Sequence, residues 1–180
     1  NTPVSYADTA SIDAFSRLRV ASPSHVFDSQ LTYDLQPLLY EPVTLNAGAA
    51  VTHDATNRCA TMAFVGTTTG GKAFMQSFEH FRYQPGRSQG IFVTFNFIET
   101  MADTLKFVGY SDGSNGIELQ QSGSTVQFAL LSDTSAGDET VTQANWNLDK
   151  FDGTGPSGVT LDLTKAQILV VDFQALYVGR

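Results

Sequence analysis

The chain lacks the features that cross-link a protein or place it in a membrane. Its one cysteine, Cys59, excludes a disulfide within the chain, and we expect this residue to be a small buried hydrophobe rather than a nucleophile. No apolar run approaches the roughly 20 residues of a membrane-spanning helix. The first residues, NTPVSYADTAS, also lack the basic and apolar regions of a signal peptide. We therefore expect no membrane partner.

Basic residues are scarce as well. The 180 residues include 10 Lys and Arg against 18 Asp and Glu, which gives a formal net charge of −8, and the basic side chains are scattered rather than clustered. An acidic surface repels phosphate backbones, so we expect no nucleic acid partner.

What the chain does contain is typical of a globular protein rich in β-strands. Hydrophobic residues make up 42% of it and charged residues 16%, which argues against disorder. Thirteen Phe and six Tyr accompany many β-branched residues, the types that strands prefer. No segment sustains an apolar helical period beyond about three turns.

Alternation of apolar and polar residues predicts the strands. In the clearest case one face carries Ile91, Val93, Phe95 and Phe97, while the other carries Thr94 and Asn96. Other short strands are expected within 26–34, 42–67, 70–83, 104–112, 116–123, 124–133 and 167–180, with turns at 46–48, 53–57, 84–87 and 112–116. Residues 133–147 are expected to form a polar loop that ends in a helical turn.

These elements predict an all-β fold with little helix, an antiparallel β-sandwich or jelly roll. We expect a single domain over residues 21–180, preceded by an extended N-terminal arm over residues 1–20 whose sequence is polar and aperiodic.

The stretch GTGPSG, residues 153–158, fits the G-x-G-x-x-G fingerprint of dinucleotide-binding proteins. That fingerprint requires a strand before the first glycine and a helix after the last. Here the preceding residues are polar and turn-like, the following residues are rich in β-branched types, and Pro156 removes a backbone donor. We expect these glycines to shape a loop between strands, and we expect no cofactor.

No catalytic or metal-binding pattern is present in the sequence. The three histidines, His25, His53 and His80, are isolated, and nothing organises a nucleophile, a base and an orienting acid, so we expect no enzyme and no metal site. Asp149, Asp152 and Asp162 bracket the glycine stretch but do not fit the EF-hand spacing. Two interpretations of these aspartates stay open: they belong to a calcium loop of another type, or they are ordinary solvated carboxylates.

A sugar-binding function is a further alternative. Trp146 lies in a polar loop near Asp149 and Asp152, and an exposed aromatic side chain beside such groups is able to stack on a host surface glycan. The competing interpretation is that Trp146 covers the edge of the core.

Two stretches of the chain match motifs of a known family. The first contains Asp13, Ala14, Phe15, Arg17, Leu18, Arg19 and Val20, followed by Phe27, Asp28 and Ser29, and it is similar to a DAFGRLRVS-type motif with a following FDS. The second is the run WNLDKFDGTGPSG together with the strand that leads to VGR at residues 178–180. Both resemble structural proteins of tailed bacteriophages. Ser16 departs from the usual glycine of the first motif.

The resemblance implies a virion building block and no catalytic residues. Such a protein is of the head-decoration, head-fibre or tail-fibre type, is made in the host cytoplasm and is located on the particle surface. Its expected partners are other virion proteins and copies of itself, in a homo-oligomer such as a trimer. We expect the subunit contact to involve residues 11–41 or the last strand, with the assembly residues Phe15, Arg17, Leu18, Arg19, Val20 and Phe27.

The family resemblance also implies further strands beyond the VGR triplet. An open sheet edge has unpaired backbone groups that attract a neighbouring strand. We therefore expect the β-pattern at the last strand to be completed by additional chain or by a partner.

Overall fold

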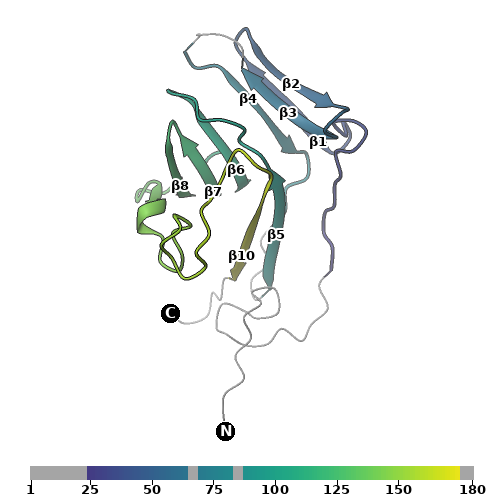
Figure 1. Cartoon of the computed structure of the whole chain (residues 1–180). Helices are drawn as coiled ribbons and strands as arrows, with labels where there is room; N and C mark the ends of the chain where they lie inside the picture. The colour runs from purple at the N-terminus through teal and green to yellow at the C-terminus, as the bar shows by residue number, and fades with distance from the viewer. Residues whose placement is uncertain (1–23, 65–68, 83–86, 175–180) are drawn as a thin grey trace. The chain divides into compact units, whose positions relative to one another are not determined.

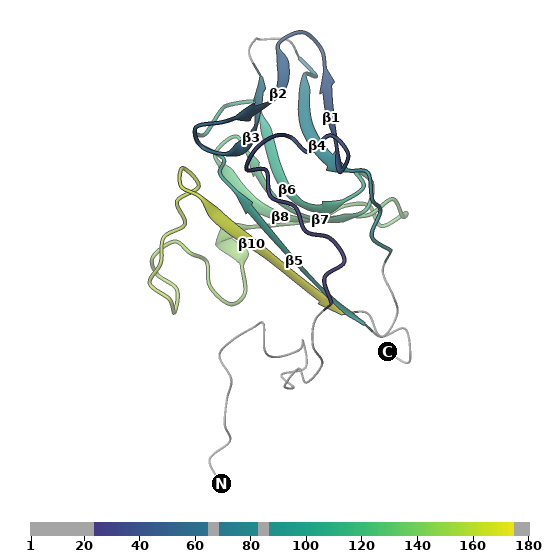
Figure 2. The same ribbon diagram turned by 90° about the vertical axis from the view of Figure 1, so that its right-hand side faces the viewer.

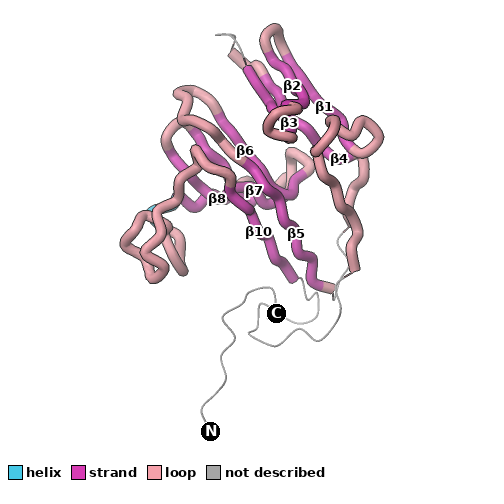
Figure 3. The backbone as a smooth tube through the Cα atoms, turned by 45° about the vertical axis from the view of Figure 1, so that its right-hand side comes forward, coloured by secondary structure: helices cyan, strands magenta, loops and turns pink. Residues whose placement is uncertain are grey.

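The computed structural model describes residues 24–64, 69–82 and 87–174. These residues contain ten β-strands and one short 3-10 turn, with no α-helix among them, which confirms the all-β class (Figure 3). They divide into two compact units, one up to Arg82 and one from Arg87 onward. The expected arm over residues 1–20 lies outside the described residues, and the expected domain boundaries stay a prediction.

The first unit consists of two antiparallel ribbons (Figure 1). One pairs β1 (Tyr40–Leu45) with β4 (Lys72–Ser77), and the other pairs β2 (Ala49–Asp54) with β3 (Cys59–Phe64). The two ribbons contact each other where β2 meets β1 and β4 and where β3 meets β4. No residue of this unit is buried within the part of the chain that the structure describes.

The turns of the first unit follow the sequence prediction. Between β1 and β2, Asn46 and Gly48 have φ of 68° and 95°, values that favour these residue types. Between β2 and β3, the Asp54 carboxylate accepts hydrogen bonds from the Thr56 and Asn57 amides at 2.8 and 3.0 Å. An aspartate that binds its own turn in this way replaces strand pairing locally.

Two expectations for this unit are wrong. Residues 26–34 form no strand, because Gln36 gathers them into a loop through hydrogen bonds with Ser29 and the Gln30 carbonyl at 2.5 Å each. Cys59 is exposed rather than buried, because it begins β3 opposite Asp54, at the end of the hairpin.

The second unit contains a four-stranded antiparallel sheet in the order β6-β7-β8-β9. Its strands are β6 (Leu105–Ser111), β7 (Gly116–Ser122), β8 (Thr125–Leu131) and β9 (Glu139–Thr142), followed by the 3-10 turn η1 (Gln143–Asn145). The helical turn at the end of residues 133–147 is confirmed. Strand β9 was not expected there, and it forms because it pairs with β8.

A separate ribbon pairs β5 (Ser88–Phe95) with β10 (Gln167–Gln174), two strands far apart in sequence that run side by side (Figures 1 and 2). Its inner face carries Ile91, Phe95, Leu169, Val171 and Phe173, which pack against the four-stranded sheet. Leu119 of β7 is 4% exposed and lies at the centre of that contact. The predicted face of Ile91, Val93 and Phe95 is therefore the face toward the core.

The opposite face of the four-stranded sheet is polar at its centre. Glu118 is 4% exposed and accepts hydrogen bonds from Ser111 at 2.5 Å and Gln120 at 2.8 Å. Gln127, directly opposite Gln120 in the register, donates to the Gln120 side chain at 3.0 Å. Because each group in this row has a partner, the cost of burying it is offset.

Truncation of Leu119 tests this account of the core. We expect Leu119→Ala to lower the free energy of unfolding by about 2–5 kcal/mol, because it removes buried contacts and leaves a cavity. The control is Leu148→Ala, since Leu148 is 86% exposed and its loss is expected to change stability by less than about 0.5 kcal/mol. Equal losses in urea unfolding of the two variants would contradict the assignment of the core.

Candidate functional site

Trp146 covers the edge of the core. Its ring lies 5.0 Å from the Phe128 ring and 6.2 Å from the Phe151 ring, measured between centroids, and its indole Nε1 donates to the Val141 carbonyl at 3.2 Å. The side chain also packs against the cluster around Leu119. These contacts agree with the interpretation that Trp146 covers the edge of the core.

Asp149 holds the glycine stretch in shape. Its carboxylate accepts hydrogen bonds from the amides of Phe151 and Ser157, both at 2.8 Å. A Cβ at Gly155 would lie 2.1 Å from Asp149 Oδ1, so only glycine leaves room for this carboxylate. The Ser157 amide of the glycine stretch is therefore occupied by the Asp149 carboxylate of the same chain.

The remainder of the glycine stretch closes a narrow loop. The Gly153 amide donates to the Val159 carbonyl at 3.1 Å, and Asp152 and Thr160 form an antiparallel bridge. Gly153 and Gly158 have φ of 86° and 65°, the left-handed conformation that glycine adopts without strain. The expectation of a shaped loop between strands is confirmed, and the residues after it lead into strand β10 rather than a helix.

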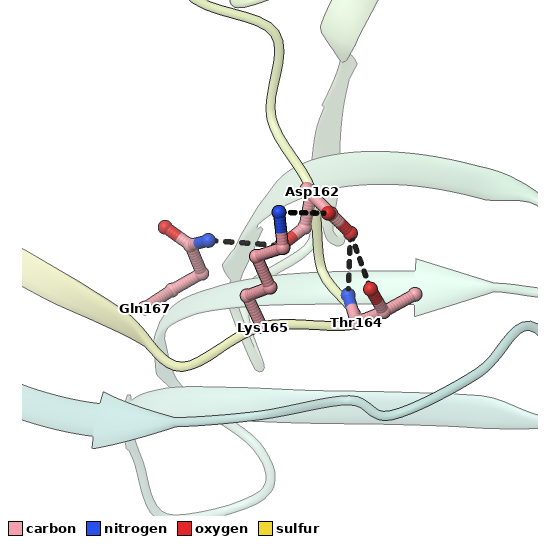
Figure 4. Close-up of polar contacts among 4 residues, drawn as sticks. All are labelled: Asp162, Thr164, Lys165 and Gln167. Carbon is pink, nitrogen blue, oxygen red and sulfur yellow. Dashed lines mark hydrogen bonds and ion pairs between the residues drawn. The ribbon is translucent and has the colours of Figure 1, made fainter.

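Asp152 and Asp162 each organise a local turn. The Asp152 carboxylate accepts hydrogen bonds from the side chain and the amide of Thr154, at 2.6 and 2.9 Å. Asp162 does the same with Thr164 at 2.5 and 3.0 Å and also pairs with Lys165 Nζ at 3.3 Å (Figure 4). In both cases the Thr side-chain bond is the main cause that lowers the carboxyl pKa.

Glycan contact by Trp146, Asp149 and Asp152 stays a prediction. The structure places Trp146 on the core edge, and both carboxylates accept hydrogen bonds within turns of their own segment. Among the residues that the structure describes, no three His, Cys, Asp or Glu side chains form a group able to hold a metal ion.

Of the expected assembly residues, only Phe27 falls within the described residues. Phe15, Arg17, Leu18, Arg19 and Val20 lie outside them. The Phe27 ring packs edge-on against Tyr40 and Phe81, at centroid distances of 5.8 and 5.1 Å. It attaches the segment before β1 to the first unit.

A second surface was not identified from the sequence. On the outer face of the β5–β10 ribbon, Phe92, Ile168 and Val170 are 66%, 67% and 47% exposed. Phe92 and Val170 face each other in the register, and Ile168 lies beside them. We call these three residues the outer ribbon patch. The sequence does contain a signal for this surface, the continuous apolar run ILVV at residues 168–171. A strand with one solvent-exposed face alternates apolar and polar residues, and this run does not.

An open groove lies at one end of the four-stranded sheet. It has a volume of about 560 Å³ and is formed by residues 98–100, the β7–β8 hairpin and residues 160–165. Three segments far apart in sequence meet there, so no local motif predicted it. Asp162 and Lys165, drawn in Figure 4, are at its rim.

No helix within the described ranges is long and apolar enough to cross a membrane. Comparison with known proteins found no family model, no curated protein and no solved structure that matches the chain.

The Asp149 carboxyl gives a pH-dependent prediction. Its pKa is held below the ordinary value of 3.8, chiefly by the Phe151 amide and then by the Ser157 amide. A lowered folded-state pKa contributes stability that is fully present above the unfolded pKa and is lost as the pH falls through the folded value. We expect wild type to exceed Asp149→Asn in unfolding free energy by a constant amount from pH 7 to about pH 5, and by less below about pH 4.

Urea unfolding at pH values from 7 down to 3 measures this difference. Asp133→Asn, in the exposed loop before β9, is the matched control and is expected to have little effect on stability at pH 7. A gap between wild type and Asp149→Asn that widens as the pH falls would reverse the sign and refute the role of the carboxylate.

Proposed function

We propose that the chain is a structural component of a tailed-bacteriophage virion, of the head-decoration, head-fibre or tail-fibre type. In this proposal it is a building block without a catalytic step. It assembles on the particle surface through contacts with copies of itself and with other virion proteins. The observation that carries the assembly is the outer ribbon patch, and the context of a virion comes from the resemblance of the two sequence motifs.

The outer ribbon patch favours a second copy of this chain as its partner. Of the side chains at the outer register positions of residues 88–94 and 168–172, the only charged one is Asp172, whereas the whole chain has a net charge of −8. Two copies repel each other over most of their surface, and the repulsion is weakest where charge is absent. The centres of stable interfaces are likewise depleted of charged residues.

The first unit supports assembly independently. Its described part has no buried residue, and seven of its large apolar side chains are exposed: Val26, Tyr33, Leu38, Leu39, Leu45, Met62 and Phe78. Two-stranded ribbons are marginally stable in water unless a further layer covers an apolar face. Contact with a neighbouring subunit supplies such a layer.

The proposal extends to the fold. We infer that the β5–β10 ribbon and the four-stranded sheet are two layers of a β-sandwich, related to the jelly-roll type, that is completed when subunits assemble. The contact of Leu119 with Leu169 and Val171 supports the two layers. Within the described residues β5 and β10 pair only with each other, which leaves one edge of each strand for a partner strand.

The mass of the chain in solution tests the proposal. We expect light scattering coupled to size exclusion to give a multiple of the 19.4 kDa chain mass. Ile168→Lys is expected to shift the mass toward one chain, because it puts a charge into the outer ribbon patch. Leu148→Lys is the control, since Leu148 is also exposed but lies in a loop.

Two results would contradict the proposal. A wild-type chain that is monomeric at all concentrations, or equal dissociation by the two lysine variants, would remove the outer ribbon patch as an interface. For the virion itself, antibodies against the chain should label purified particles, and particles that carry no such chain would exclude the location.

A further inference from the structure

The groove at the end of the four-stranded sheet is lined by polar and apolar side chains, and half of its lining residues carry a hydroxyl or a carboxylate group. Thr100, Ser124, Thr160 and Thr164 supply hydroxyl groups, and Glu99 and Asp162 supply carboxylates. A second groove of about 580 Å³ adjoins it, and the two share Thr100 and Ser124. Together they form one surface of mixed polar and apolar character around the tip of the β7–β8 hairpin. All of its residues belong to the second unit.

Gln121 is a buried polar side chain in the wall of this groove. It is 6% exposed, and its amide nitrogen donates to Thr100 Oγ1 at 3.5 Å, the limit of a hydrogen bond. The amide oxygen has no hydrogen-bond partner among the described residues. Because an unpaired buried acceptor costs free energy, a ligand hydroxyl that donates to this oxygen gains more than it would at an exposed acceptor.

The rim of the groove is held in an unusual backbone conformation. Ile98 has a φ of 62°, rare for a β-branched residue, and the Glu99 amide donates across it to the Phe97 carbonyl at 2.7 Å, as in a γ-turn of the strained type. Lys106, opposite Gln121 in the register, donates to the carbonyls of Phe97 and Glu99. These hydrogen bonds hold the strained backbone next to Glu99 and Thr100, and strained backbone of this kind often accompanies a binding site.

The chemistry of the lining limits the ligand. Carboxylate and amide oxygens accept hydrogen bonds from ligand hydroxyls, and Ser and Thr hydroxyls both donate and accept. The carboxylates of the two grooves, Glu99, Asp162 and Asp103, outnumber the ammonium groups near them, which belong to Lys165 in the lining and Lys106 at the rim, so the site disfavours anions. The apolar part of the lining, against which the C–H groups of a sugar ring fit, consists of Ile98, Val126, Leu161 and Leu163.

We propose that this groove binds a neutral oligosaccharide, with Gln121, Thr100 and Ser124 as contact residues. The site is distinct from the sugar contact expected at Trp146. The ligand lies along the two adjoining grooves, and its hydroxyls pair with the side chains of the lining.

Amide NMR of the full chain tests the proposal with defined probes. The probes are neutral linear oligosaccharides of glucose, galactose, mannose, rhamnose and N-acetylglucosamine, with oligogalacturonate as the anionic counterpart. We expect at least one neutral probe to shift the Gln121 side-chain amide and the Thr100 and Ser124 backbone amides, with dissociation constants of about 1 mM or lower. The anionic probe is expected to bind at least tenfold more weakly.

Substitutions separate binding from folding. Gln121→Leu keeps the volume and removes the unpaired acceptor, so the thermal unfolding midpoint is expected to stay equal or rise while probe affinity falls about tenfold or more. Ser124→Ala is expected to weaken binding without affecting stability. Thr140→Ala, on the opposite face of the same sheet, is the control and should bind as wild type does.

Three outcomes would overturn the proposal. They are the absence of shifts with every neutral probe, equal binding of oligogalacturonate, and shifts centred on Trp146 instead of Gln121. None of these outcomes depends on the oligomeric state. The test of sugar binding in the groove is therefore independent of the test of the proposed structural function.

Discussion

The second unit depends on one contact, the packing of the β5–β10 ribbon on strand β7. Leu119, Leu169 and Val171 are the buried members of that contact, and they are contributed by two strands that are about fifty residues apart in the sequence. The hydrophobic effect acts between them only when these two distant segments meet, so this layer is a non-local element. The groove, the glycine loop and the outer ribbon patch all take their positions from it, because residues 160–167 lead directly into β10.

Outside that small core, aspartate side chains stabilise the turns that connect the strands. Asp54, Asp112, Asp149, Asp152 and Asp162 each accept hydrogen bonds from backbone amides of their own turns. Such bonds are local and need no core, so a chain with few buried side chains still has well-defined connections between strands. The pKa of all five carboxyls is lowered, chiefly by the Thr154 and Thr164 side-chain bonds at Asp152 and Asp162 and by backbone amides at the other three, so they stay ionised to a lower pH than an ordinary aspartate.

What was predictable from the sequence was local. The face of Ile91, Val93 and Phe95 follows from alternation alone, and the turns after Asn46, Asp54 and Asp112 follow from residue type. Strand β9 was not predictable, because Glu139–Thr142 is polar and becomes a strand only by pairing with β8. The loop at Asp149 followed from its glycines, whereas the groove required residues 98, 121 and 162 to meet. For Trp146 the sequence left two interpretations open, a glycan contact and a cover over the core edge, because it does not show the neighbouring Phe128 and Phe151 rings.

The absence of buried residues in the described part of the first unit has a consequence for the local stability of that unit. A segment whose backbone hydrogen bonds are all near solvent opens at low free energy, so its amides exchange with water and its turns are cut by proteases well before the second unit unfolds. If a neighbouring subunit covers it, that opening becomes linked to association by mass action. The apparent stability of the first unit is then a function of protein concentration, so dilute and concentrated preparations of the same chain will differ in protease resistance.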